Sequence, residues 1–234
     1  MVLPTWHTSA AFAYLHHCIF AWTWHLSCKT IALKINKDFP RTALYKYDAV
    51  SNITGCQTDN LFVLDSTGSL KDDFDKQLNY LKNVVKQMEL GPTNHVGVII
   101  FASRRRKRVA IPMGKYTDHD SLLAQIEKLP YLSGTTWLGE ALTLARKTLD
   151  KRRSNNIRVN VVVLSDGFST DITKGPADDL RKMQNVEIYA AGVPSVINEQ
   201  ELLDTVGDAS HLFHGTDTVP DLFRAMQLCG IRRA

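Results

Sequence analysis

Runs of apolar residues alternate with amphipathic stretches from about residue 58 onward. The runs are short and bounded by turn residues, which is typical of buried strands. They are LFVLD (61–65), HVGVIIFA (95–102), RVNVVVLSD (158–166), VEIYAAGV (186–193) and HLFHG (211–215). A further short run, RVAIP (108–112), follows the second strand through SRRRK, and this arrangement predicts an antiparallel hairpin at an edge of the sheet.

The stretches between these strands have the spacing of helices. In residues 72–90 the apolar positions recur every three or four residues, acidic residues open the segment and Gly91-Pro92 closes it. Helices are likewise predicted over 121–129, 139–150, 178–184, 199–207 and 219–229. Alternating strands and helices predict an α/β fold, in which a mainly parallel sheet with one antiparallel edge strand has helices on both faces.

Composition narrows the class of protein. The chain has 234 residues, of which 44% are hydrophobic and 22% charged, as in soluble globular proteins. A net charge of +4 is too mild to indicate a nucleic-acid partner. The sequence lacks an apolar stretch of the roughly 18 residues that a membrane span needs.

Residues 1–55 form an N-terminal extension without this regular pattern. Residues 9–24 are largely apolar, but no Lys or Arg precedes them and no clear A-x-A cleavage site follows. A degenerate secretory signal, a disordered extension and a gene-model artefact all remain open interpretations.

Two of the predicted strands end in an aspartate, and hydroxyl side chains lie nearby in the sequence. Asp65 is followed by Thr67 and Ser69, Asp166 ends the strand at 158–166, and SGTTWLGEAL (133–142) lies between them in the chain. If the strands are neighbours, these groups converge at the carboxyl edge of the sheet, where open α/β sheets bind ligands. Oxygen ligands alone suit Mg²⁺, Mn²⁺ or Ca²⁺ rather than Zn²⁺ or Cu²⁺. The alternative is that the aspartates cap helices and the hydroxyls bond turn amides.

The segments DSTGSL, GTTWLGEAL and VVLSDG together resemble the von Willebrand factor type A domain and its metal-ion-dependent adhesion site. The family pattern has D-x-S-x-S after the first strand, a threonine before a G-x-A-L helix, and an aspartate in an S-D-G or T-D-G turn. Matching this pattern implies that Asp65, Thr67, Ser69, Thr136 and Asp166 hold Mg²⁺ or Mn²⁺. Thr67 stands where serine is usual and keeps the hydroxyl. Counting back from GEAL selects Thr136 over Thr135.

The resemblance also implies a Rossmann-like, doubly wound fold, with the domain predicted at residues 56–230. It implies a non-enzymatic, secreted adhesion or matrix module whose cation binds a carboxylate of a protein ligand. One alternative is a Mg²⁺-dependent phosphatase-like enzyme, although the D-x-D of haloacid-dehalogenase-like phosphatases is absent after the strand. Another is an intracellular scaffold. The chain also lacks the phosphate-binding motifs G-x-x-x-x-G-K-[ST] and G-x-G-x-x-G.

Cysteines and a glycosylation motif bear on the compartment. In extracellular family members a disulfide often joins the two ends of the domain, and the resemblance implies that Cys56 and Cys229 form it here. Asn52 begins the N-x-[ST] motif Asn52-Ile53-Thr54 just before Cys56. Both features favour an oxidising compartment.

The densest charge run is Arg104, Arg105, Arg106, Lys107 and Arg108. It is interpreted first as a solvated turn that protects an edge strand from pairing. The alternative is a basic binding patch for a sulfated glycan or another acidic partner.

Overall fold

The structure is a computed structural model that describes residues 57–227; residues 1–56 and 228–234 lie outside the described part. The predictions for Asn52, Cys56 and Cys229 fall outside the described residues. The six-stranded sheet has the order β3-β2-β1-β4-β5-β6. Its strands are β1 (Thr58–Asp65), β2 (Asn94–Phe101), β3 (Lys107–Ile111), β4 (Arg158–Leu164), β5 (Val186–Gly192) and β6 (Leu212–His214).

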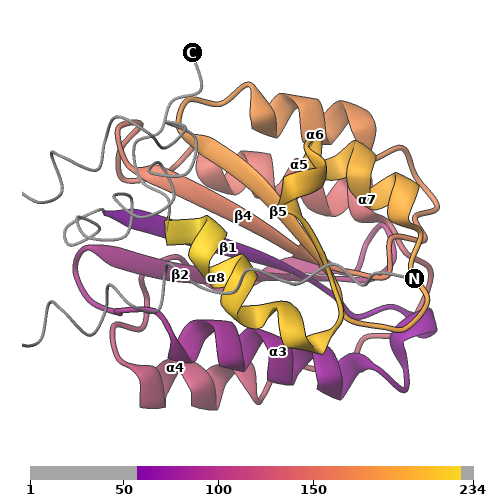
Figure 1. Ribbon diagram of the computed structural model, residues 1–234, viewed down its shortest axis with the longest axis horizontal. Coiled ribbons are helices and arrows are strands. Elements are labelled where there is room, and N and C mark those ends of the chain that lie inside the picture. The colour runs from indigo at the N-terminus through magenta and orange to yellow at the C-terminus, as the bar shows by residue number, and fades with distance from the viewer. Residues whose placement is uncertain (1–56, 228–234) are drawn as a thin grey trace, which may run out of the picture. The chain divides into compact units, whose positions relative to one another are not determined.

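Helices cover both faces of the sheet, as Figure 1 shows. They are α3 (Phe74–Lys86), α4 (His119–Ile126), α5 (Leu138–Leu149), α6 (Lys174–Arg181), α7 (Glu199–Val206) and α8 (Val219–Gln227). Alternate residues of β1 face opposite cores. Phe62 and Leu64 pack with α3, α4 and α8, whereas Leu61 and Val63 pack with α5, α6 and α7. The apolar run of the first strand is continuous because both of its faces are buried.

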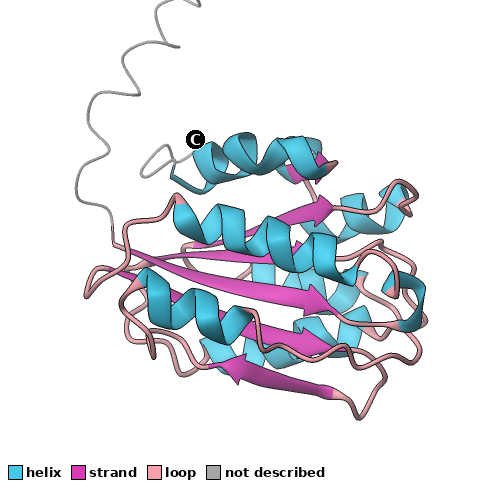
Figure 2. Cartoon of the chain, turned by 90° about the horizontal axis from the view of Figure 1, so that it is seen from below, coloured by secondary structure: helices cyan, strands magenta, loops and turns pink. Residues whose placement is uncertain are grey.

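Strand direction brings the carboxyl ends of the parallel strands to one edge. In Figure 2 the arrow of β3, at the edge of the sheet, points opposite to the arrows of the other strands, in agreement with its antiparallel pairing to β2. The strands β1, β2, β4, β5 and β6 pair in parallel. The predicted fold class is therefore confirmed, including the antiparallel edge strand. We call the edge where β1, β2, β4 and β5 end the carboxyl edge.

Helix α6 begins earlier than the sequence pattern predicts. The pattern predicts a start at residue 178, but α6 begins at Lys174. Its first turn contains Pro176, and proline is tolerated there because its missing N–H has no intrahelical acceptor.

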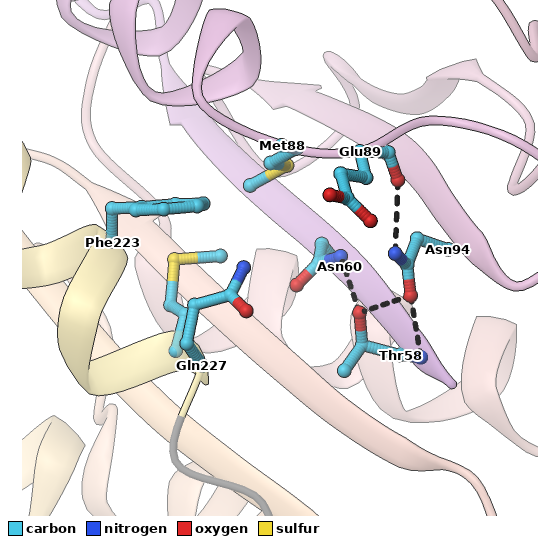
Figure 3. A pocket seen from close by; sticks show the side chains of 8 residues that line it. Thr58, Asn60, Met88, Glu89, Asn94, Phe223 and Gln227 are labelled. Carbon is cyan, nitrogen blue, oxygen red and sulfur yellow. Dashed lines mark hydrogen bonds between the residues drawn. The ribbon is translucent and has the colours of Figure 1, made fainter. Parts of the chain in front are cut away.

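The amino edge of the sheet is closed by buried amides. The Asn160 side chain donates to Asn60 Oδ1 at 2.7 Å and to the carbonyl of Met226, in α8, at 3.2 Å. Beside this network, Figure 3 shows a small pocket between the starts of β1 and β2, the segment after α3, and α8. Thr58 and Gln227 both line it, so the first residue of β1 and the last residue of α8 lie close together.

Gln77 in α3 is a buried polar residue without a partner. Its side chain is 0% exposed, and neither amide atom has a hydrogen bond within residues 57–227. An unmade buried hydrogen bond costs about 1–3 kcal/mol. Gln77→Met is therefore expected to raise the free energy of unfolding by about 1 kcal/mol, measured by urea denaturation of the full chain. Gln77→Glu, the control, buries a charge and should destabilise. A loss of stability in Gln77→Met would mean that a buried water bonds the amide.

Candidate metal centre

The two strand-end aspartates come from neighbouring strands. β1 pairs in parallel with β4 up to Leu64 opposite Leu164, so Asp65 and Asp166 follow side by side at the carboxyl edge. Asp65 is 0% exposed; its Oδ1 accepts from the Thr67 amide at 3.0 Å and its Oδ2 from the Ser165 hydroxyl at 2.6 Å. Asp166 Oδ1 accepts from the Phe168 amide at 3.1 Å. Each aspartate bonds the turn amide two residues later, as the alternative of helix caps and turn bonds expects in part, but neither is the N-cap residue of α3, α4, α5, α6 or α7, so the helix-cap part of that alternative is wrong.

Three hydroxyls form a chain beside these carboxylates. Thr136 Oγ1 donates to Thr67 Oγ1 at 3.1 Å, and the hydroxyls of Thr67 and Ser69 share a hydrogen bond, also of 3.1 Å. Thr67 and Thr136 are buried, whereas Ser69 is exposed. Thr135 points elsewhere, because its Oγ1 accepts from the Trp137 indole. The structure thus brings together the hydroxyls of Thr67, Ser69 and Thr136, whereas within residues 57–227 Asp166 makes no hydrogen bond to them.

Backbone hydrogen bonds hold the loops in this arrangement. The loop after β1 bonds the loop before α5 through Gly68 N to Gly134 O, at 2.8 Å, and Ser133 N to Ser66 O, at 2.9 Å. Gly134 has φ +112°, a conformation that favours glycine. The loop after β4 is tied to the same segment, since Thr170 N donates to Thr136 O at 2.8 Å. Three segments far apart in sequence are therefore joined by backbone hydrogen bonds at the carboxyl edge.

The electrostatics of the centre are those of a carboxylate without a cationic partner. Burial raises the pKa of Asp65 to about 7, and the nearby Asp166 charge also raises it, while hydrogen bonds from Ser165 and Thr67 lower it. Within residues 57–227 no Lys, Arg or His forms an ion pair with Asp65. The same residues contain no group of three or more His, Cys, Asp or Glu side chains suited to a metal. The donor set is two carboxylates and three hydroxyls, a set suited to a hard divalent cation.

Asp171 is a site residue that the sequence interpretation missed. From the loop after β4, its two carboxylate oxygens accept from the amides of Gly139 and Glu140 at 2.9 and 2.8 Å, at the start of α5. Ser169 donates to Asp171 Oδ1 at 2.8 Å and accepts from the Leu138 amide at 3.3 Å. A Cβ on Gly139 would lie 2.3 Å from the carbonyl oxygen of Ile172, so this close approach requires glycine. Together these contacts hold the helix that directly follows Thr136.

Exposed apolar side chains gather at the same edge. Among the described residues, the large hydrophobic side chains classed as exposed are Tyr131, Phe168, Ile172 and Val196. All of them lie on loops at the carboxyl edge: before α5, after β4 and after β5. Tyr131 also reaches the loop of the centre, with its hydroxyl 3.4 Å from Gly68 O. Clustered exposed apolar groups mark interaction surfaces more often than scattered ones do.

The basic run covers the turn between β2 and β3 and the first two residues of β3, and we call it the basic turn. Arg104 and Lys107 pair with Glu140 at 3.4 and 2.9 Å, and the Arg104 guanidinium lies 5.7 Å from the Trp137 ring centroid. The predicted hairpin is confirmed.

No helix within 57–227 has both the length and the apolar content needed to cross a bilayer.

Known proteins of similar sequence are matrix and adhesion proteins. The chain is 30% identical to the collagen alpha-5(VI) chain of Mus musculus over 167 residues, covering 68% of this chain and 6% of that one. It is 30% identical to the transmembrane cell adhesion receptor mua-3 of Caenorhabditis elegans over 175 residues, covering 71% and 4%. The chain thus spans only a small part of the length of these relatives.

Solved structures share the fold. Proximal thread matrix protein 1 from the mussel byssus, with a zinc-occupied MIDAS motif, matches with a TM-score of 0.66 and 22% identity over 74% of this chain and 46% of that one. Manganese-loaded Plasmodium vivax TRAP protein matches with a TM-score of 0.65 and 18% identity over 74% and 75%. The sequence profile of the von Willebrand factor type A domain matches residues 59–224. The six-stranded sheet and the residues at its carboxyl edge agree with this match. The chain therefore belongs to the von Willebrand factor type A domain family.

Proposed function

We propose that the chain is a binding module that uses a divalent cation, Mg²⁺ or Mn²⁺, to bind an acidic side chain of a protein ligand. One observation carries the proposal. The buried Asp65 carboxylate has no cationic partner among the described residues, yet it lies beside a chain of three hydroxyls. A buried charge left unpaired is costly, and a bound cation would compensate it.

Thr67, Ser69 and Thr136 would hold the cation through their hydroxyls, with Asp65 and Asp166 binding it directly or through water. When bound, the cation would supply an electrophilic position for a ligand carboxylate, since few of its protein ligands are anionic. The chain's own contribution is to fix these oxygens in place. Mg²⁺ and Mn²⁺ are proposed from the oxygen donors, and Zn²⁺ is the competitor to test, because the motif of the mussel protein holds zinc.

The proposed setting is extracellular and non-enzymatic, with the domain at residues 56–230. The relatives are collagen chains and an adhesion receptor, which supports this setting.

A Cys56–Cys229 disulfide is part of the proposal. Thr58 and Gln227, each two positions from one of these cysteines, line the same pocket, which supports the pairing. Peptide mapping without reduction tests it, and free thiols at both positions would contradict it. Glycosylation of Asn52 is also proposed, because Asn52-Ile53-Thr54 is a glycosylation motif and the proposed setting is extracellular.

Cation-dependent capture tests the binding function. The full chain is applied to immobilised extracellular matrix extract in Mg²⁺, washed, and then eluted with EDTA. The proposal expects binding that EDTA releases and that Asp65→Asn lacks. Binding that is equal in EDTA, or equal in Asp65→Asn, would contradict it.

Cation affinity is expected to depend on pH through Asp65. Its pKa in the cation-free folded domain is about 7, above the ordinary 3.8, so between about pH 4 and pH 7 the folded state keeps a proton that the unfolded state has lost. The cation-free domain therefore loses stability as pH rises through this window. A cation must displace this proton, so its affinity should be about 100-fold weaker at pH 5 than at pH 8. Calorimetric Mn²⁺ titration at several pH values measures this, and a flat profile would contradict it.

Asp171 is expected to act on the centre by positioning α5. Loss of a capping side chain costs about 1–2 kcal/mol, so Asp171→Ala should destabilise the domain by about that amount. It should also weaken Mn²⁺ binding severalfold, because the segment holding Thr136 loses its anchor. Asp171→Asn, which keeps one acceptor, should recover part of both losses. Lower stability with unchanged Mn²⁺ affinity would show that the contact is structural only.

A further inference from the structure

The turn between β2 and β3 lies at the rim of the candidate metal centre. Ser66, next to Asp65, donates its amide to Phe101 O at 2.9 Å, at the end of β2. Trp137, next to Thr136, donates its amide to Ala102 O at 3.1 Å. Arg106 Nη1 donates to Leu132 O at 3.1 Å, in the loop before α5. The end of β2 is therefore bonded to the segment after β1, and the basic turn that follows it is bonded to the loop before α5.

Most of the positive charge of this turn is not neutralised. Glu140 is the carboxylate that pairs with it, through Arg104 and Lys107; the hydrogen bond from Lys107 lowers the pKa of Glu140. In the described part of the chain, no carboxylate pairs with Arg105, Arg106 or Arg108. A solvated turn that only protects the edge strand would not need to be fastened to the loops of the centre.

The rim has two chemically different sides. The basic turn follows β2, on one side of the centre, whereas Phe168 and Ile172 follow β4, on the other side, with side chains 48% and 81% exposed. Positive charge next to a carboxylate-binding position favours a partner with clustered negative charge, because complementary potentials speed encounter and stabilise the complex.

Resting on the function proposed above, we propose that the ligand is an acidic protein segment carrying at least two carboxylates. One carboxylate binds at the cation, and another contacts the guanidinium groups of Arg105 and Arg108. Apolar residues of the segment pack on Phe168 and Ile172. Ionic strength should weaken binding through the second carboxylate, since its contacts are exposed.

A random-peptide display library tests the proposal on the full chain. Peptides are bound in Mg²⁺ and eluted with EDTA from the wild type, from Arg105→Glu/Arg108→Glu and from Lys86→Glu/Lys151→Glu. Among the described residues, the side chains of Arg105 and Arg108 make no hydrogen bond or ion pair, so their replacement should leave folding intact. The second variant is the charge-matched control, because Lys86 and Lys151 are exposed and lie at the ends of α3 and α5 away from the carboxyl edge.

The wild type and the lysine variant are expected to select peptides with two or more Asp or Glu residues. The arginine variant should keep one selected carboxylate and lose the enrichment of the second. Replacing the second carboxylate by Ala in a selected peptide should weaken wild-type binding about fivefold and leave the arginine variant unchanged. Identical selections by all three proteins would overturn the proposal while leaving the cation function intact.

Heparin distinguishes a sulfated glycan from an acidic peptide. Two results together would overturn the proposal in favour of a glycan patch. The first is retention on heparin in EDTA that is lost in the arginine variant but kept in Asp65→Asn. The second is peptide selection without enrichment of a second carboxylate. If the wild type yields no EDTA-elutable peptide at all, the cation function itself fails and this proposal fails with it.

Discussion

Asp65→Asn is expected to abolish stabilisation of the domain by Mg²⁺ and Mn²⁺, and to stabilise the domain when chelator is present. The first effect follows from mass action, because a cation at 100 times its Kd stabilises the folded state by about 2.7 kcal/mol. The second follows from burial, which raises the pKa of Asp65 to about 7. Each pKa unit corresponds to about 1.4 kcal/mol, so removing the charge at pH 8 should stabilise the cation-free domain by at least about 1 kcal/mol.

The substitution preserves the local hydrogen bonds. The Asn side-chain oxygen can still accept from the Thr67 amide, and its amide group can donate to the Ser165 hydroxyl, which now acts as acceptor. Thermal unfolding of both proteins in EDTA and in increasing Mg²⁺ checks the prediction. Wild type and variant should exchange their order of stability as Mg²⁺ rises. A wild type that gains nothing at millimolar cation would contradict the account.

Arg153→Ala is expected to lower the free energy of unfolding by about 3 kcal/mol. Asp59 in β1 is 1% exposed, and Arg153 pairs with it through Nη2 at 2.8 Å and Nε at 3.1 Å. The same guanidinium also donates to the carbonyls of Pro92 and Thr93. Removing one partner of a buried ion pair costs about 3–5 kcal/mol. His95, whose Nδ1 lies 3.5 Å from Asp59 Oδ1, would remain as the neighbouring group of the Asp59 carboxylate. The low end applies because the Arg153 side chain is 28% exposed and water can partly replace it.

A double-mutant cycle isolates the charge effect. Asp59→Asn/Arg153→Ala removes both charges, so it should be more stable than Arg153→Ala alone. Urea denaturation of the four proteins measures the coupling between the two residues. If the loss of stability in the double variant equals the sum of the losses in Asp59→Asn and Arg153→Ala, the ion pair contributes little. The destabilisation by Arg153→Ala would then come from its lost hydrogen bonds to the loop before β2.

The sequence predicted the sheet well because its signals are local. Apolar runs such as Leu61–Leu64 require burial on both faces, and this requirement fixes a central parallel strand. The expectation that β1 and β4 are neighbours brought Asp65 and Asp166 to the same edge of the sheet, whereas the choice of Thr136 over Thr135 came from the family resemblance. The roles of these residues in binding a cation stay predictions.

The features that were missed depend on contacts between distant segments. The bonds from Asp171 to the start of α5 join residues 31 and 32 positions apart, and the Asp59–Arg153 pair joins residues 94 apart. No local pattern shows that the loop after β4 lies against α5.

The most direct test of the account is a Mn²⁺ titration of the full chain followed by electron paramagnetic resonance, in which free Mn²⁺ is visible and bound Mn²⁺ is not. At pH 7.5 the account predicts one bound Mn²⁺ per chain, displaced by Mg²⁺ and absent in Asp65→Asn, with Zn²⁺ tested as a second competitor. A free Mn²⁺ signal equal to the total at every concentration up to millimolar would contradict the claim that these residues form a cation site.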